Sequence, residues 1–299
     1  KCPRENFDRS KGNSMKFQYL GTGAAEGVPA VFCHCPACRE IRRRGESEFH
    51  SRSQLLIDGE VCVDFPPDAY YHSLRFGADL AAVRYLLVTH SHMDHFYAHD
   101  FILRGYKYAA GISSKLQIFG NEEVKKVFDE CTRREMRPDV RSTTEMTTVR
   151  PFEPFVFGQS GEYTAVALKA NHSKTECAYV YYFEKAGKVY LHLTDTGRLP
   201  EETLDFLEEY ARARGKTAAL VTFDSTFLFY EAGANARHMG LPDNAAMKGE
   251  FLRRKIADVH TAYVMTHYSH NNFPFRETLE RAEREYGFRA AYDGMTLEI

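Results

Sequence analysis

The residues with the clearest capacity for chemistry lie in one short segment, Thr-His-Ser-His-Met-Asp-His at positions 89–95. Three imidazoles and one carboxylate fall within the six residues 90–95, and both groups are ligands for zinc, manganese or iron. His90 and His92 are two residues apart, so a helix would point them to different faces. The spacing therefore predicts a loop that wraps these side chains around an ion, with Asp94 and His95 able to face a second ion.

Ligand-type residues also follow other apolar segments whose β-branched and aromatic content predicts strands. The loop itself follows the predicted strand 83–89, and the further cases are 61–63 before Asp64, 188–194 before Asp195, 218–223 before Asp224 and 263–266 before His267. Because α/β folds assemble their sites at strand ends, these side chains are expected to meet in one place.

A second cluster is formed by Cys33, Cys35 and Cys38, in a Cys-x-Cys-x-x-Cys pattern. Three thiols at this spacing suit a closed tetrahedral zinc site that needs a fourth ligand. His34 lies between two of the cysteines and is sterically awkward for the same ion, so His270 is the better candidate. The alternative interpretation is a set of buried thiols.

The remaining pattern predicts an α/β protein. Predicted helices cover 36–44, 201–214, 275–286 and most of 96–137, the last interrupted by a strand at 115–119; further strands are predicted at 16–20, 53–57, 162–169, 179–183 and 288–292. Residues 1–14 are polar and are interpreted as an N-terminal tail. Residues 15–299 contain no clear linker, and ligands from both halves must meet, so one domain is predicted.

Composition excludes several classes of protein. The chain has 299 residues, 13 His, 7 Cys and a net charge of −2. This charge argues against a surface dedicated to nucleic acid or anionic membrane, and no apolar run is long enough to span a bilayer. The odd number of cysteines favours metal ligation over a disulfide framework. A cytoplasmic location is therefore predicted.

The His-x-His-x-Asp-His pattern after an apolar strand resembles the metal motif of the metallo-β-lactamase superfamily. The resemblance extends to Asn171-His172-Ser173, Leu193-Thr194-Asp195-Thr196 and Met265-Thr266-His267. It implies a four-layer αβ/βα sandwich. It also implies that one ion is held by His90, His92 and His172, that the other is held by Asp94, His95 and His267, and that Asp195 bridges them.

From Met15 onward the chain resembles, more narrowly, the subgroup containing the phosphoribosyl cyclic phosphate phosphodiesterases. The matching elements include 21–23, 27–30, the three cysteines, 266–270 and Tyr292-Asp293-Gly294-Met295. In that subgroup the last residue of His-x-x-His completes the Cys₃ zinc site, which supports His270. The resemblance also implies a catalytic role for His238. Two segments, 96–148 and the one before His238, are longer than is expected for that subgroup. These differences bear on the identity of the substrate and not on the metal ligands.

The function implied is a metal-dependent phosphodiesterase that hydrolyses a small cyclic, sugar- or nucleotide-like ester with hydroxide held at the dinuclear site. The active-site ions would be zinc or manganese, with iron as an alternative. His238 would bind a non-bridging oxygen or protonate the leaving group, and Asp94 would share in catalysis. Asp64 and Asp224 are candidates to orient ligand histidines, or are ordinary strand-end residues. Ser173 and Lys174 are candidate phosphate contacts.

Two other functions are considered. A transfer-RNA 3′-processing endonuclease shares the metal motif, but the chain lacks a Gly-rich basic arm. A non-catalytic accessory protein of cofactor biosynthesis would keep the cysteines and have a depleted dinuclear motif, whereas all seven ligands are present here. The predicted partner is thus a small phosphodiester, with nucleic acid disfavoured, no membrane, and a homodimer left open.

Overall fold

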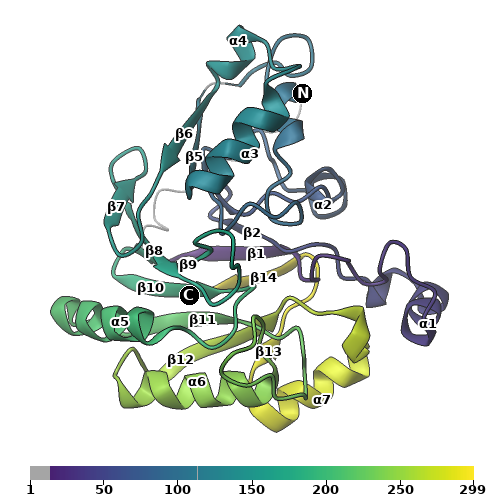
Figure 1. Ribbon diagram of the computed structural model, residues 1–299, viewed down its shortest axis with the longest axis vertical. Coiled ribbons are helices and arrows are strands. Elements are labelled where there is room, and N and C mark those ends of the chain that lie inside the picture. Colours follow the sequence, from purple (N-terminus) through teal and green to yellow (C-terminus); the bar gives the residue numbers. More distant parts are fainter. Residues whose placement is uncertain (1–13, 113) are drawn as a thin grey trace.

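The computed structural model describes residues 14–112 and 114–299. The predicted N-terminal tail therefore lies outside the described residues, except for Ser14. Within the described part, the strands form two seven-stranded sheets that pack face to face, with helices on both outer faces (Figure 1).

The first sheet is built from the N-terminal half of the chain and the C-terminal strand. Its order is β14 (Met295–Glu298), β1 (Lys16–Gly21), β2 (Gln54–Ile57), β3 (Val61–Val63), β4 (Tyr85–Leu87), β5 (Leu116–Gly120) and β6 (Thr144–Thr148). Neighbours from β14 to β3 are antiparallel, and those from β3 to β6 are parallel.

The second sheet repeats this arrangement. Its order is β13 (Arg289–Ala290), β12 (Ala257–Thr266), β11 (Ala218–Asp224), β10 (Lys188–Leu193), β9 (Tyr179–Lys185), β8 (Tyr163–Lys169) and β7 (Pro154–Phe157). Strands β7 to β10 are antiparallel, and β10 to β13 are parallel. Each sheet thus has a parallel half whose strands end at one edge, where loops can gather reactive groups.

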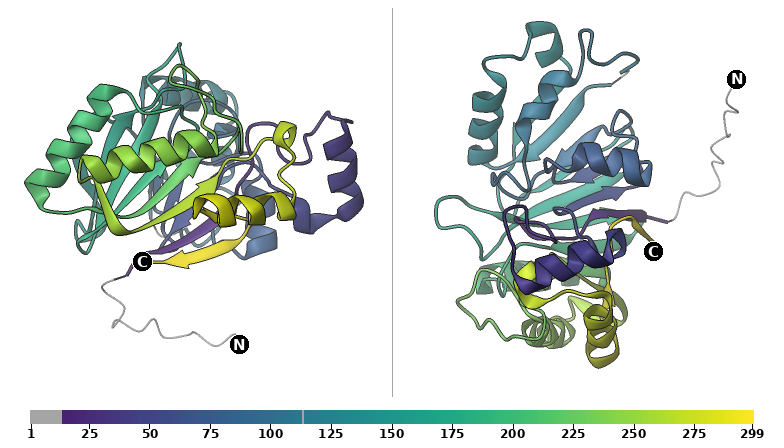
Figure 2. Two further views of the ribbon diagram at one scale, coloured as in Figure 1. Left: turned by 90° about the horizontal axis from the view of Figure 1, so that it is seen from below. Right: turned by 90° about the vertical axis from the view of Figure 1, so that its right-hand side faces the viewer.

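Helices complete the outer layers. They are α1 (Pro36–Arg44), α2 (Ala69–Phe76), α3 (Glu122–Thr132), α4 (Pro138–Arg141), α5 (Glu201–Arg214), α6 (Leu241–Arg253) and α7 (Arg276–Tyr286), with 3₁₀ turns η1 (Glu46–Glu48), η2 (Ala98–Leu103) and η3 (His270–Asn272). Helices α5, α6 and α7 cover the second sheet, while α1 projects to one side of the sandwich (Figures 1 and 2).

Three apolar clusters hold the layers together. The inter-sheet core includes Phe17 from the first sheet and Tyr190 from the second. Outside the second sheet, Leu207 and Phe251 bring α5 and α6 onto the strands; outside the first sheet, Phe128 of α3 does the same. Burial of such side chains contributes roughly 1.5–3 kcal/mol each. The predicted four-layer α/β sandwich is confirmed.

Most predicted elements are present, and the differences have local reasons. Within 96–137 the strand predicted at 115–119 is confirmed as β5, but the predicted helix is present only at η2 and α3, because the stretch from η2 to β5 carries turns and Gly105 and Gly111. The last predicted strand shrinks to the two residues of β13. The prediction omitted α2, α6, β6, β7 and β14; β6 and β7 lie at sheet edges, where half of each strand faces water and apolar periodicity is weak.

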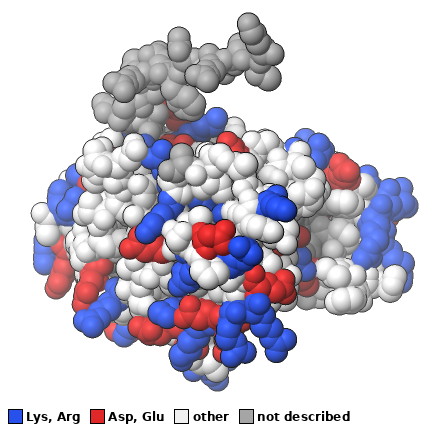
Figure 3. Space-filling model, turned by 90° about the horizontal axis from the view of Figure 1, so that it is seen from above, with Lys and Arg blue, Asp and Glu red and all other residues white. Residues whose placement is uncertain are grey.

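Two surface properties bear on the function. Every helix among the described residues is too short or too polar to cross a bilayer. On the face drawn in Figure 3, basic and acidic side chains are interspersed and form no continuous basic surface.

Candidate metal centre

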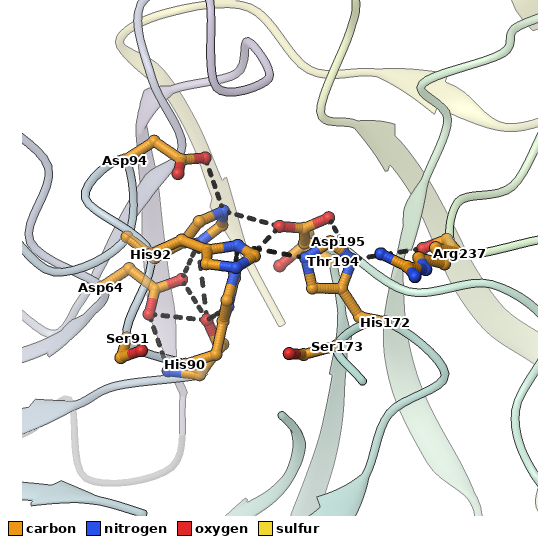
Figure 4. Close-up of polar contacts among 12 residues, drawn as sticks. Asp64, His90, Ser91, His92, Asp94, His172, Ser173, Thr194, Asp195 and Arg237 are labelled. Atoms are coloured by element: carbon orange, nitrogen blue, oxygen red, sulfur yellow. Dashed lines mark hydrogen bonds and ion pairs between the residues drawn. The ribbon is translucent and has the colours of Figure 1, made fainter. Parts of the chain in front are cut away.

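Seven side chains from the ends of strands in both sheets converge between the two sheets, and we call them the histidine–aspartate centre. Its members are His90, His92, Asp94, His95, His172, Asp195 and His267. Segment 90–95 follows β4, His172 follows β8, Asp195 follows β10 and His267 follows β12. The residues that the sequence predicted as ligands are thus brought together by the fold; Figure 4 labels His90, His92, Asp94, His172 and Asp195 among them.

One half of the centre consists of three imidazoles around one point. Nδ1 of His92 lies 2.9 Å from Nε2 of His90 and 3.3 Å from Nε2 of His172. Ligand nitrogens that share a tetrahedral zinc ion at about 2.0–2.1 Å are separated by about 3.3 Å. Asp195 closes this group, with all four ligand atoms within 4.8 Å of one another. The spacing fits one divalent ion.

The other half joins Asp94, His95 and His267 to the same aspartate, again within 4.8 Å. Oδ2 of Asp195 lies 3.1 Å from Nε2 of His95 and 3.2 Å from Nε2 of His90. One carboxylate therefore touches imidazoles of both groups, which is the position that a bridging ligand needs.

Unpartnered polar atoms at the centre support metal binding. Among the described residues, Nε2 of His95, Nε2 of His267 and Oδ1 of Asp195 are buried and form no hydrogen bond of good geometry, although Nε2 of His95 lies 3.1 Å from Oδ2 of Asp195 and Nδ1 of His238 lies 3.1 Å from Oδ1 of Asp195. Leaving such atoms unsatisfied costs about 1–3 kcal/mol each, and a cation would satisfy them. Asp195 and His267 also have positive φ angles of 52° and 65°, a conformation that costs about 1–3 kcal/mol in non-glycine residues and persists chiefly at functional sites. The donor set thus fits divalent ions.

Two buried carboxylates orient the imidazoles. Oδ2 of Asp64 lies 2.7 Å from Nδ1 of His95, and the carboxylate also accepts hydrogen bonds from the backbone and hydroxyl of Thr89. Oδ2 of Asp224 lies 3.3 Å from Nδ1 of His267 and 3.1 Å from Nδ1 of His238. Both carboxylates therefore stand where partners of metal-binding histidines are found.

The charges of the centre reinforce one another. Burial raises the pKa of Asp195, but the surrounding imidazoles, His267 first, outweigh it and hold the pKa well below its usual range. Burial dominates at His172 and lowers its pKa to about 4. A bridging carboxylate that stays ionised and an imidazole that stays neutral are the protonation states in which these groups bind metals.

His238 lies outside the two groups described above and forms a further group with Asp195, Asp224 and His267, whose ligand atoms also lie within 4.8 Å of one another. Its Nδ1 is 3.1 Å from both Asp195 and Asp224, and its side chain is 26% exposed, against 4% for Asp195. Burial lowers its pKa, but the carboxylates of Asp224 and Asp195 raise it to about 11. His238 and the exposed His92 mark the side on which the centre meets solvent.

The cysteine site consists of Cys33, Cys35, Cys38 and His270, whose ligand atoms lie within 4.8 Å of one another. Nδ1 of His270 is 3.3 Å from Sγ of Cys38 and 3.6 Å from Sγ of Cys35. The Cys38 backbone N–H lies at the start of α1 and donates to Cys35, which lowers the pKa of that thiol to about 6. A thiolate binds zinc, so the four groups fit a structural ion.

The two predicted phosphate contacts lie near the centre without touching it. The Ser173 hydroxyl accepts hydrogen bonds from the backbone of Thr175 and Glu176, and Lys174 is exposed. Sequence reasoning did not find Glu176, which binds Ser91, or Arg237, whose carbonyl lies 3.4 Å from Nδ1 of His172. No spacing signal marks either residue, because both belong to irregular loops.

Comparisons with known proteins agree with this geometry. The model of the beta-lactamase superfamily domain matches residues 60–268, so the chain belongs to this superfamily. A crystal structure of a diphosphatase from the PhnP family has a TM-score of 0.68 at 22% identity, over 96% of this chain and 97% of that one. Zinc-bound PqqB from Methylobacterium extorquens has a TM-score of 0.69 at 19% identity, over 95% and 100%.

A curated relative matches a short part of the chain. An octanoyltransferase from Porphyromonas gingivalis is 35% identical over 85 residues, which are 27% of this chain and 16% of that protein. The family model and the histidine–aspartate ligand set agree on the beta-lactamase superfamily. The predicted superfamily is confirmed, and the individual ligand roles stay predictions.

Proposed function

We propose that this protein is a metal-dependent phosphodiesterase acting on a small cyclic, sugar- or nucleotide-like phosphodiester. The observation that carries the proposal is the complete histidine–aspartate centre, in which one buried carboxylate, Asp195, lies between two groups of imidazoles. Two divalent ions at such a centre, zinc or manganese, supply positive charge for phosphate oxygens and lower the pKa of a bound water.

The chain would hold the substrate and the ions with distinct groups. His90, His92 and His172 would bind one ion, while Asp94, His95 and His267 would bind the other. Asp195 would contact both ions. These ligands are buried except for His92, so the ester would approach from the side where His92 and His238 reach solvent.

His238 would act on the substrate oxygens through its second ring nitrogen. Because Nδ1 faces the carboxylates of Asp195 and Asp224, Nε2 is the atom left to contact the ester. It would donate a hydrogen bond to a non-bridging oxygen or a proton to the leaving oxygen. Asp224 would keep the ring oriented. A positioned general acid typically contributes about 10²–10⁴-fold in rate.

The test is hydrolysis by protein stripped with a chelator and reloaded with Zn²⁺ or Mn²⁺. Bis-p-nitrophenyl phosphate is the first substrate, followed by five-membered cyclic phosphates of ribose and nucleosides. We expect metal-dependent turnover that is greatest for a cyclic ester. A protein that binds two ions at the centre and hydrolyses none of these compounds overturns the proposal.

A second substrate class is favoured by one comparison, since a structure of similar fold belongs to a diphosphatase. The same assay therefore includes a dinucleoside diphosphate, and turnover of this anhydride in preference to every diester would identify that activity. The complete centre favours either enzyme over a non-catalytic accessory protein. Such a protein would retain an ion in the cysteine site and bind none at the histidine–aspartate centre.

A further inference from the structure

The carboxylate of Glu176, on the loop that carries His172, is bound by Ser91 from the ligand segment 90–95 and by Asn121 after β5. The Ser91 hydroxyl donates to Oε1 of Glu176 at 2.7 Å, and the Ser91 backbone N–H lies 3.1 and 3.2 Å from the two oxygens. Nδ2 of Asn121 donates to Oε2 at 2.8 Å. All of these donors are neutral, so the contact differs from a surface ion pair.

Ser91, Asn121 and Glu176 each lie in a loop at the end of a strand. Ser91 lies between His90 and His92, and Glu176 lies four residues after His172 on the loop between β8 and β9. Asn121 follows β5, where its side chain caps α3 by accepting from the backbone of Val124. One carboxylate therefore joins two strand ends of the first sheet to the loop of the second sheet that supplies a histidine.

Among the described residues, the N–H and hydroxyl of Ser91 donate only to Glu176, while the carbonyl of His92 accepts from the backbone N–H groups of His95 and Phe96. Segment 90–95 has no regular structure that would set the orientation of two histidines two residues apart. The turn that carries Glu176 is held by the Ser173 hydroxyl, which accepts from two successive backbone N–H groups. A further bond, from the backbone N–H of Tyr179 to the carbonyl of Thr89, lies at the strand ends behind the loops.

Metal ligands must be held within about 0.5 Å of their productive positions by supporting contacts. The carboxylate of Glu176 holds both the N–H and the hydroxyl of Ser91, so it restricts the backbone from which His90 and His92 extend. Its own backbone position is tied to that of His172 through four residues. Figure 4 shows Ser91 beside His90 and Ser173 beside His172, on the two loops that this carboxylate connects.

We infer that Glu176 is a positioning residue that sets the mutual geometry of His90, His92 and His172 as the ligands of one ion. The inference rests on the metal ligation in the proposed function. It assigns to Glu176 the task of connecting the ligand loops of the two sheets, whereas Asp64 and Asp224 each orient imidazoles at one place.

The experiment measures metal affinity and does not require turnover. Glu176→Ala, Glu176→Gln and Ser91→Ala are titrated with Zn²⁺ in competition with a chromophoric chelator, and their Co²⁺ forms are recorded in visible absorption. Thr175→Ala is the matched control, because Thr175 is exposed on the same loop and its side chain contacts the Ser173 hydroxyl.

We expect Glu176→Ala to weaken binding at the centre by about 10–100-fold, the usual effect of removing a partner that supports a ligand. Glu176→Gln retains one acceptor for Ser91 and should recover part of the affinity. The Co²⁺ spectrum should change in Glu176→Ala and stay as in wild type in Thr175→Ala. Ser91→Ala combined with Glu176→Ala should weaken binding by less than the product of the two single effects.

Several results would overturn the inference. Wild-type affinity and an unaltered Co²⁺ spectrum in Glu176→Ala would do so, even if its metal-free form unfolds at a lower temperature. If Glu176→Ala does not fold, wild-type metal affinity in both Glu176→Gln and Ser91→Ala would also overturn the inference. A wild-type centre that binds no ion would overturn it as well. Absence of ester hydrolysis by metal-loaded wild type overturns the proposed function alone.

Discussion

The histidine–aspartate centre, with two four-ligand groups that share Asp195, and the cysteine site, with one four-ligand group, are built in opposite ways. Three ligands of the cysteine site come from residues 33–38 at the start of α1, and His270 is the single distant member. The histidine–aspartate centre takes its ligands from the ends of strands in both sheets. One site is mostly local in sequence, and the other exists only where the two sheets meet.

This difference separates what each site can do. The cysteine site has four protein ligands, which closes a tetrahedral ion and suits a structural role. The histidine–aspartate centre shares one carboxylate between two ligand groups and reaches solvent at His92 and His238. A substrate can therefore approach the centre, while an ion in the cysteine site would stabilise the segment that contains α1.

The largest expected effect tests the shared carboxylate. Asp195→Ala removes the one side chain that contacts both ligand groups, so we expect the centre to lose its ions and all metal-dependent hydrolysis. The cysteine site should keep one equivalent of zinc, because none of its ligands contacts Asp195. Metal content by mass spectrometry and turnover of bis-p-nitrophenyl phosphate provide the check. Retention of three equivalents of metal would contradict the assignment.

The next prediction separates ligands from their neighbours within the centre. His238→Gln should lower kcat by about 10²–10⁴-fold, as expected for loss of a general acid. Its metal content should equal that of wild type, because each ion in the proposed assignment keeps its ligands without His238, although His238 also lies in a group with Asp195, Asp224 and His267. Steady-state kinetics and metal analysis on the same preparation decide the matter. A parallel loss of metal would make His238 a ligand instead.

Disruption of the cysteine site should act on stability more than on chemistry. Cys35→Ser should release one equivalent of zinc and lower the melting temperature, because a structural ion contributes its binding free energy to folding. We expect kcat to fall by less than about tenfold, since the two sites share only the segment between His267 and His270. Calorimetry and kinetics test this. A hundredfold loss of kcat at full stability would show that the sites are functionally coupled.

A smaller effect is expected at the open side of the centre. The Arg237 carbonyl lies near His172, and its exposed side chain is a candidate to attract an anionic ester. Arg237→Ala should raise KM by roughly three- to tenfold, in line with the net contribution of roughly 0.5–1.5 kcal/mol that one hydrogen bond makes, while kcat changes little. The KM of Lys174→Ala is measured for comparison. Equal KM values for Arg237→Ala and wild type would remove this residue from the substrate path.

The smallest effect concerns pH and the segment between the two sites. His50 bonds to Thr22 and packs against Tyr268, between His267 and His270. Burial lowers its pKa to about 4, against about 6.5 when unfolded. Its contribution to stability is therefore present above pH 6.5 and is lost as pH falls towards 4. In urea unfolding, the free energy of unfolding of His50→Gln should fall less steeply between pH 6.5 and 4 than that of wild type. If the free energy of unfolding falls equally steeply with pH in His50→Gln and wild type, groups other than His50 cause the acid sensitivity.

The sequence predicted the fold class and several of its elements, and it missed others. The helices 36–44 and 201–214 were predicted at their observed bounds, because a first-turn proline or acidic residues and a terminal glycine mark their ends. The stretch after His95 was predicted as helix and is mostly irregular. The edge strands β6 and β7 and the short β14 were not predicted. Their pairing depends on distant partners and leaves a weak local pattern in the sequence.

By itself, the sequence determined the donor groups and their order, because the type and spacing of His, Asp and Cys follow from ligand chemistry. The tertiary structure alone decided which imidazole nitrogens face one another, that Asp195 lies between the two groups, and that Glu176 binds Ser91. The physical reason is that loop conformation and sheet packing bring together residues far apart in the chain. No local sequence pattern predicts such contacts, whereas strand ends and turns can be predicted from the types of neighbouring residues.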